Sequence, residues 1–97
     1  MTLRTVFRRA AVAEFCEARA WYDSRREGLG DEFVECVEAA LASAERAPEQ
    51  HQRVHGDIRR ILVRRFPYGV FDVIENNTLV VLAIFHCARE PIIWKSR

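Results

Sequence analysis

Residues 59–89 read RRILVRRFPYGVFDVIENNTLVVLAIFHCAR, and this stretch decides the fold. Two apolar segments are joined by Asn76 and Asn77, a pair that suits a two-residue hairpin turn because asparagine tolerates positive φ. Arginine pairs precede the first segment, whereas His86 and Arg89 follow the second. The pattern predicts three consecutive strands with functional residues along their edges.

The turn also sets a register for the last two strands. It pairs residues directly across the hairpin: Glu75 with Thr78, Val73 with Val80, Phe71 with Leu82, Gly69 with Ile84 and Pro67 with His86. Residues 79–85 are then apolar on both faces, as in a central strand covered on both sides. Because only the tail 91–97 remains to cover the second face, we expect a partner chain to help cover it.

The residues before this stretch predict one strand and two helices. Residues 3–8 alternate as a short strand, and from Ala10 to Glu27 the apolar spacing becomes that of an amphipathic helix. Gly28-Leu29-Gly30 permits a reversal into a second helix that ends at Pro48, and residues 49–57 are polar and predict a loop. The expected fold is α+β, in the order strand, helix, helix, three strands (βααβββ). Its small antiparallel-rich sheet carries an αα-hairpin on one face, in one domain spanning residues 1–97.

Composition excludes several classes of protein. With 97 residues, 49% of them hydrophobic, the chain can build one core but has no apolar run of the ~18 residues typical of a membrane span. We expect a cytoplasmic location and no membrane partner. Three cysteines without CxxC spacing predict reduced thiols. His51 and His55 are four apart, but they follow Pro48 where no long helix is expected, so we predict neither a metal nor a cofactor.

Charge is divided unevenly along the chain. Residues 13–50 carry ten acids against four arginines, and the rest of the chain carries eleven bases against four acids. This asymmetry predicts one acidic and one basic surface, and the basic one suits an anionic partner. The alternative is an ordinary solvated surface whose uneven charge has no function.

The chain has no phosphate-binding glycine loop, nucleophile elbow or HExxH motif. The candidates for binding a target or an anion are therefore arginines, one histidine and one aromatic residue: Arg59, Arg60, Arg65, His86, Arg89 and Trp94. His86 has two interpretations, a titratable group at the sheet rim or a strand cap bonded to neighbouring backbone. Arg89 is either an anion clamp or the partner of an acid such as Asp72, and Trp94 suits packing of the tail.

Together, these motifs resemble the RelE/ParE superfamily of toxins from bacterial type II toxin–antitoxin modules. The resemblance covers almost the whole chain, and it is carried by ordered motifs: Trp21-Tyr22, Gly28-Leu29-Gly30, Phe66-Pro67-Tyr68, and His86 followed by Arg89, Pro91 and Trp94. It implies a toxin that forms a hetero-oligomer with a cognate antitoxin, whose C-terminal segment wraps around it.

The resemblance leaves two targets open. Some members are ribosome-dependent mRNA endonucleases, whereas the ParE-like branch resembles inhibitors of DNA gyrase. Ribonuclease members commonly carry an arginine where this chain has Gly69, and their lysine-rich region is missing here because Lys95 is the only lysine. The FPY and HxxR-x-P motifs favour the ParE-like branch, and hence a plasmid-stabilisation-like module that causes growth arrest.

Two alternatives to the gyrase target stay open. In the first alternative the chain is an mRNA endoribonuclease. Its catalytic candidates are then His86, Arg89 and Arg65, with His86 as the general acid or base. Otherwise it is a degenerate toxin that only binds antitoxin, an interpretation that Gly69 and Asp72 keep open because relatives more often have an arginine or aromatic residue in this strand.

Overall fold

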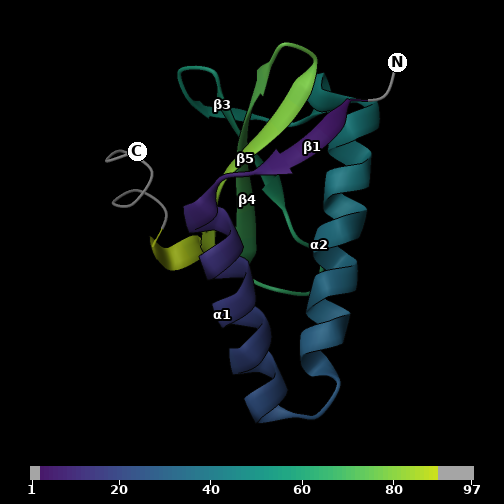
Figure 1. Ribbon diagram of the computed structural model, residues 1–97, viewed down its shortest axis with the longest axis vertical. Coiled ribbons are helices and arrows are strands. Elements are labelled where there is room, and N and C mark those ends of the chain that lie inside the picture. The colour runs from purple at the N-terminus through teal and green to yellow at the C-terminus, as the bar shows by residue number, and fades with distance from the viewer. Residues whose placement is uncertain (1–2, 90–97) are drawn as a thin grey trace.

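The computed structural model describes residues 3–89, which form two long helices and a five-stranded sheet (Figure 1). In chain order the elements are β1 (Arg4–Phe7), α1 (Arg9–Arg25), α2 (Leu29–Arg46), the 3-10 helix η1 (Pro48–Gln50), β2 (Arg53–His55), β3 (Ile58–Leu62), β4 (Tyr68–Glu75), β5 (Thr78–His86) and the 3-10 helix η2 (Cys87–Arg89). No described helix is long and apolar enough to cross a membrane.

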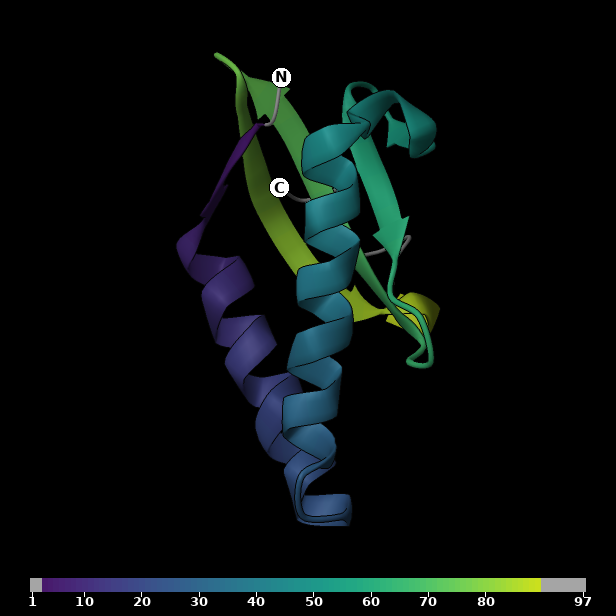
Figure 2. The ribbon, with the colours of Figure 1, turned by 90° about the vertical axis from the view of Figure 1, so that its right-hand side faces the viewer.

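The sheet has the order β1-β5-β4-β3-β2, and only β1 and β5 pair in parallel. Both helices lie against one face of this sheet (Figure 2). The expected α+β fold with an αα-hairpin on one face is confirmed. Residues 49–57, however, are not simply a loop. They contain η1 and β2, which pairs with β3 through Arg53 and His55.

The helix reversal depends on two glycines. Gly28 has a φ of 87°, which a residue without a Cβ adopts at little cost. At Gly30 a Cβ would lie 2.5 Å from the backbone oxygen of Arg19, so no other residue lets the two helices come so close. The Gly30 amide donates a 2.8 Å hydrogen bond to Asp23 Oδ1, which satisfies one of the open N–H groups in the first turn of α2.

The turn between β4 and β5 forms where the sequence predicts it. Asn76 and Asn77 have φ values of 50° and 59°, and the expected pairs next to the turn, such as Glu75 with Thr78, are confirmed. Farther from the turn the predicted register is wrong by one residue. A bulge between Phe71 and Asp72 in the ladder pairs Phe71 with Ala83, where the sequence predicts Leu82.

The same bulge corrects the remaining predicted pairs. Gly69 lies opposite Phe85, and Tyr68 lies opposite His86. An extra residue on one strand shifts the alternation of side chains on that strand beyond the bulge. Phe71 consequently shares a face with Ala83 and Phe85 instead of with Ile84.

The apolar residues of the sheet pack on both of its faces. The larger cluster lies under the helices and includes Phe33, Val70, Leu79 and Ile84. On the opposite face Phe71, Ala83 and Phe85 are 0%, 1% and 2% exposed, with partly buried residues of β2 and β3 packed against them. We expected a partner chain to cover this second face, and that expectation is wrong for these residues, because they are already buried in the chain itself.

Candidate functional site

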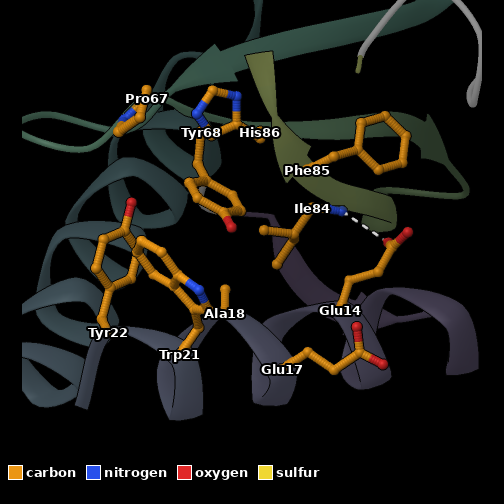
Figure 3. Close-up of a pocket in the computed structure, with 10 residues that line it drawn as sticks. All are labelled: Glu14, Glu17, Ala18, Trp21, Tyr22, Pro67, Tyr68, Ile84, Phe85 and His86. Carbon is orange, nitrogen blue, oxygen red and sulfur yellow. Dashed lines mark hydrogen bonds between the residues drawn. The ribbon is translucent and has the colours of Figure 1, made fainter. Parts of the chain in front are cut away.

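A cavity of about 570 Å³ lies between α1 and the adjoining ends of β4 and β5 (Figure 3). We call it the His86 cavity. It is lined from α1 by Glu14, Glu17, Ala18, Trp21 and Tyr22, and from the sheet by Pro67, Tyr68, Ile84, Phe85 and His86. The α1 residues share one side of the helix because they are spaced three or four apart.

Aromatic rings form a continuous wall along one side of this cavity. The Tyr68 ring centroid is 5.6 Å from that of His86 and 5.9 Å from that of Tyr22, and the Tyr22 centroid is 5.1 Å from that of Trp21. Burial raises the pKa of the Tyr22 hydroxyl, and the nearby Tyr68 raises it further. The Tyr22 hydroxyl is therefore protonated at neutral pH and serves as a neutral hydrogen-bonding group.

The carboxylates of the cavity come from successive turns of α1. Glu14 accepts a 3.0 Å hydrogen bond from the Ile84 amide (Figure 3). This amide lies beyond the last residue pair that joins β1 to β5, which is Phe7 with Val81. Glu17 lines the cavity one turn later. No lysine or arginine is among its described lining residues, so the cavity presents negative charge and aromatic surface.

His86 itself is engaged with the backbone. Its Nδ1 accepts a 3.1 Å hydrogen bond from the Ala88 amide, and this acceptor role fits a ring whose proton is on Nε2. Protonating Nδ1 would place a donor opposite the amide donor. This geometry supports the interpretation in which His86 caps the strand.

Arg59 lies opposite Asp72 in the β3–β4 ladder, and Asp72 is only 2% exposed. By alternation along β4, Asp72 shares the helix-covered face with Val70. Burial raises the pKa of Asp72 to about 7, although the charge of Arg59 acts to lower it. Arg59 Nε and Asp72 Oδ2 are both enclosed without a hydrogen-bond partner in the part of the chain described. The Nε atom of Arg59 thus lies in the interior, whereas the residue as a whole is partly exposed.

Arg65 is engaged at the other end of the sheet. It adopts a φ of 72°, lies over the ring of Phe66 and forms a 2.8 Å ion pair with Glu32. Hydrogen bonds from Arg65 and then Arg26 lower the pKa of Glu32. Arg65 remains 61% exposed, so this pair adds little to stability.

The structure does not bring the predicted residues into one site. His86 lines its own cavity, Arg60 lines a hollow with His51 and Leu62, and Arg65 lines a third hollow against α2. Arg89 ends η2, and Trp94 lies outside the described residues. Within residues 3–89, no group of three or more His, Cys, Asp or Glu side chains is placed to hold a metal ion.

Apart from His86, the nine other described residues that line this cavity were not among the predicted site residues; they include Glu14, Glu17, Tyr22 and Tyr68. The motifs Trp21-Tyr22 and Phe66-Pro67-Tyr68 stand out in the sequence, but nothing in it places them side by side. Glu14 gives no signal at all, since it is one acid among many on a polar helix face.

Comparison with solved structures finds a similar backbone arrangement in several chains, of which two are described here. A chain of the chromosomal ParDE toxin–antitoxin system from P. aeruginosa has a TM-score of 0.74 at 13% identity, over 88% of this chain and 96% of that one. A chain of the toxin–antitoxin complex RelBE2 from Mycobacterium tuberculosis has a TM-score of 0.59 at 18% identity, over 89% and 99%. No family model matches the sequence. No curated protein matches it either. The two similarities confirm the expected fold.

Proposed function

We propose that the chain is the toxin of a type II toxin–antitoxin module and is neutralised by a cognate antitoxin with which it forms a hetero-oligomer in the cytoplasm. The shared fold with chains of the ParDE and RelBE2 systems supports this, because it extends over nearly the full length of both chains. The ordered motifs from Trp21-Tyr22 to His86 support it independently.

Expression without antitoxin tests this proposal. Induction in a bacterial host should arrest growth, and co-expression of a cognate antitoxin, to be sought in a short reading frame adjacent to the gene, should restore it. The two proteins should also co-purify. Normal growth in the presence of folded, soluble protein would contradict toxicity and favour the degenerate toxin that only binds antitoxin.

We further propose that the target is a protein, DNA gyrase, and that the chain does not cleave RNA. The observation that carries this step is the charge of the His86 cavity, because Glu14 and Glu17 line it and no arginine or lysine that could hold phosphate is among its described lining residues. Two of the predicted anion-binding arginines are engaged elsewhere, Arg59 beside buried Asp72 and Arg65 with Glu32.

Trp21 gives this cavity an anchor for a protein partner. Its side chain is 51% exposed, and Arg25 lies 4.5 Å above the centroid of its ring. Tryptophan is among the residue types enriched at the hot spots of protein interfaces. The target surface that we propose is therefore the aromatic rim formed by Trp21, Tyr68 and His86.

A supercoiling assay with purified gyrase distinguishes the targets. The protein should inhibit supercoiling, and Trp21→Ala should weaken the inhibition about tenfold or more. Val12→Ala is the matched control, since Val12 is 46% exposed on the same helix but does not line the cavity. No inhibition at concentrations that arrest growth would exclude gyrase.

The alternative is ribosome-dependent mRNA cleavage, which the similarity to the RelBE2 chain keeps under consideration. In that case His86 is the group available for proton transfer. Primer extension on a translated message during growth arrest gives the answer. Cleavage sites that disappear in the His86→Phe variant would identify translated mRNA, and not gyrase, as the target. Intact message during growth arrest would exclude the nuclease.

A further inference from the structure

The His86 cavity has an aromatic side and an acidic side. Its rings include those of Trp21, Tyr22 and Tyr68, and Figure 3 shows the carboxylates of Glu14 and Glu17 on the opposite side. The volume of about 570 Å³ leaves room for a long side chain between the two sides. Aromatic faces and carboxylates are the two kinds of surface that attract an organic cation.

The surface between the two sides is apolar. Ala18 and Ile84 are 4% and 1% exposed, and their side chains lie between the rings and the carboxylates (Figure 3). Long cationic side chains place their aliphatic stems along such surface and their charged heads beside polar groups. A bare metal ion would need several oxygen ligands at once, and no such group occurs within residues 3–89. The cavity therefore suits a cation at the end of an aliphatic stem.

Trp21 already contacts one guanidinium group of the chain itself. The central carbon of the Arg25 guanidinium lies 4.5 Å from the centroid of the Trp21 ring, and Arg25 is not among the described residues that line the cavity. Because Trp21 is 51% exposed, this contact leaves ring surface open. A planar guanidinium stacks on aromatic faces and binds carboxylates through paired N–H groups, whereas an ammonium is compact and strongly hydrated. Arginine therefore fits this cavity better than lysine.

Glu17 is the carboxylate that is available to such a group. It is exposed, and its side chain has no hydrogen bond or ion pair within residues 3–89. Glu14 lies one turn earlier on α1 and accepts the hydrogen bond from the Ile84 amide. An ionised carboxylate can accept several hydrogen bonds, so this bond does not exhaust Glu14. The acidic side thus offers one open carboxylate and the negative charge of a second.

We propose that the His86 cavity binds an arginine side chain on the surface of the target protein. The guanidinium group donates hydrogen bonds to Glu17 and lies against the Trp21 ring, while the aliphatic stem covers Ala18 and Ile84. Glu14 strengthens the attraction through its charge. The inference deepens the proposed function and rests on it in one respect, since the arginine belongs to the protein that the toxin inhibits.

Binding of a single capped arginine tests the cavity without a toxicity assay. The probe is N-acetylarginine methylamide, titrated into the isotope-labelled protein. It should shift the indole N–H resonance of Trp21 and the amide resonance of Glu17 with a millimolar dissociation constant. N-acetylcitrulline methylamide is the matched control, because a neutral urea replaces the guanidinium in a side chain of similar shape. The citrulline amide should bind about tenfold more weakly or worse.

Three protein variants locate the binding. Glu17→Gln should weaken binding of the arginine amide about threefold, a modest change because Glu17 is exposed. Glu35→Gln removes the same charge from an exposed position on α2 that does not line the cavity, so it should leave binding unchanged. Trp21→Leu removes the ring face but stays apolar, and it should weaken the arginine amide more than the citrulline amide. Melting curves confirm that all three variants fold.

The supercoiling assay connects the cavity with the target. Excess arginine amide should relieve the inhibition of gyrase, whereas the citrulline amide at the same concentration should not. Gyrase with each amide and without the toxin is the control. Binding of the arginine amide to Trp21 and Glu17 without any relief of inhibition would overturn an arginine of the target as the occupant.

Three further results would overturn the inference: equal binding of the two amides, equal binding to Glu17→Gln and the wild type, or binding about tenfold tighter to a Lys95→Gln/Arg97→Gln variant. The last result would make the occupant residues 90–97 of the chain itself, which lie outside the described residues. Absence of amide binding while gyrase is still inhibited would remove only the arginine site. Amide binding without inhibition of gyrase would remove only gyrase as the target.

Discussion

Replacing Asp72 with asparagine should remove a pH-dependent loss of stability that the buried carboxyl group imposes on the fold. Asp72 is 2% exposed, and burial raises its pKa from an ordinary value of 3.8 to about 7. A folded-state pKa above the unfolded-state value means that the folded protein binds the proton more tightly. The contribution of this carboxyl group to the free energy of unfolding is fully present below pH 3.8, and it is lost as the pH rises through about 7.

The size of this loss follows from the shift in pKa. Three pKa units at 1.36 kcal/mol each amount to about 4 kcal/mol at most between the two ends of the window. That is a large fraction of the total stability of a small domain. Asp72→Asn keeps the size of the side chain but cannot ionise, so its free energy of unfolding should lack this component.

Urea denaturation of both proteins between about pH 4 and about pH 8 measures the effect. The difference between wild type and Asp72→Asn isolates Asp72, because the other carboxyl groups titrate in both proteins. The free energy of unfolding of the variant should increase relative to that of the wild type as the pH rises. A difference that stays constant across this range would refute a buried, proton-binding Asp72.

Arg59→Leu provides a second test of the same pair. The charge of Arg59 acts to lower the pKa of Asp72, so its removal should raise that pKa above about 7. The loss of stability should then continue to a higher pH than in the wild type. If the loss of stability ended at the same pH as in the wild type, Arg59 would not act on the Asp72 carboxyl.

Three further substitutions test separate contacts. Gly30→Ala should cost about 1–3 kcal/mol in thermal or urea unfolding because its Cβ would meet the Arg19 carbonyl; a neutral effect would contradict this close helix contact. Asn77→Gly should stabilise the hairpin by up to about 1 kcal/mol, since Asn-Gly is the preferred pair at two positive φ values, and a lower melting temperature would argue against this turn. His86→Phe should lose about 1 kcal/mol with the Ala88 hydrogen bond but keeps an aromatic ring at the rim of the cavity, so it should still arrest growth; harmless expression of the folded variant would mean that the imidazole itself is required.

The helices and the hairpin turn could be predicted because local sequence decides them. Gly28 and Gly30 mark the reversal, and Asn76-Asn77 mark the turn, each through its own backbone preference. The bulge opposite Phe71 could not be predicted. Residues 79–85 are apolar on both faces, so a slip of one residue leaves the hydrophobic pattern intact.

β2 and the candidate site escaped prediction for a related reason. Residues 53–55 carry no apolar alternation, and β2 forms because β3 lies beside it. The placement of Arg59 beside buried Asp72 becomes visible only once the register sets the two residues opposite each other. Glu14 and His86 reach one cavity through the packing of α1 on β5, which no local pattern reveals.

The parallel pairing of β1 with β5 has a consequence for folding during synthesis. Arg4 lies opposite Thr78, so the first strand to leave the ribosome has no neighbour in the sheet until β5 has also been made. Contacts so distant along a chain slow folding, because a long loop must close before they can form. The helical hairpin can form early from local contacts alone, whereas β1 stays unpaired until late in translation.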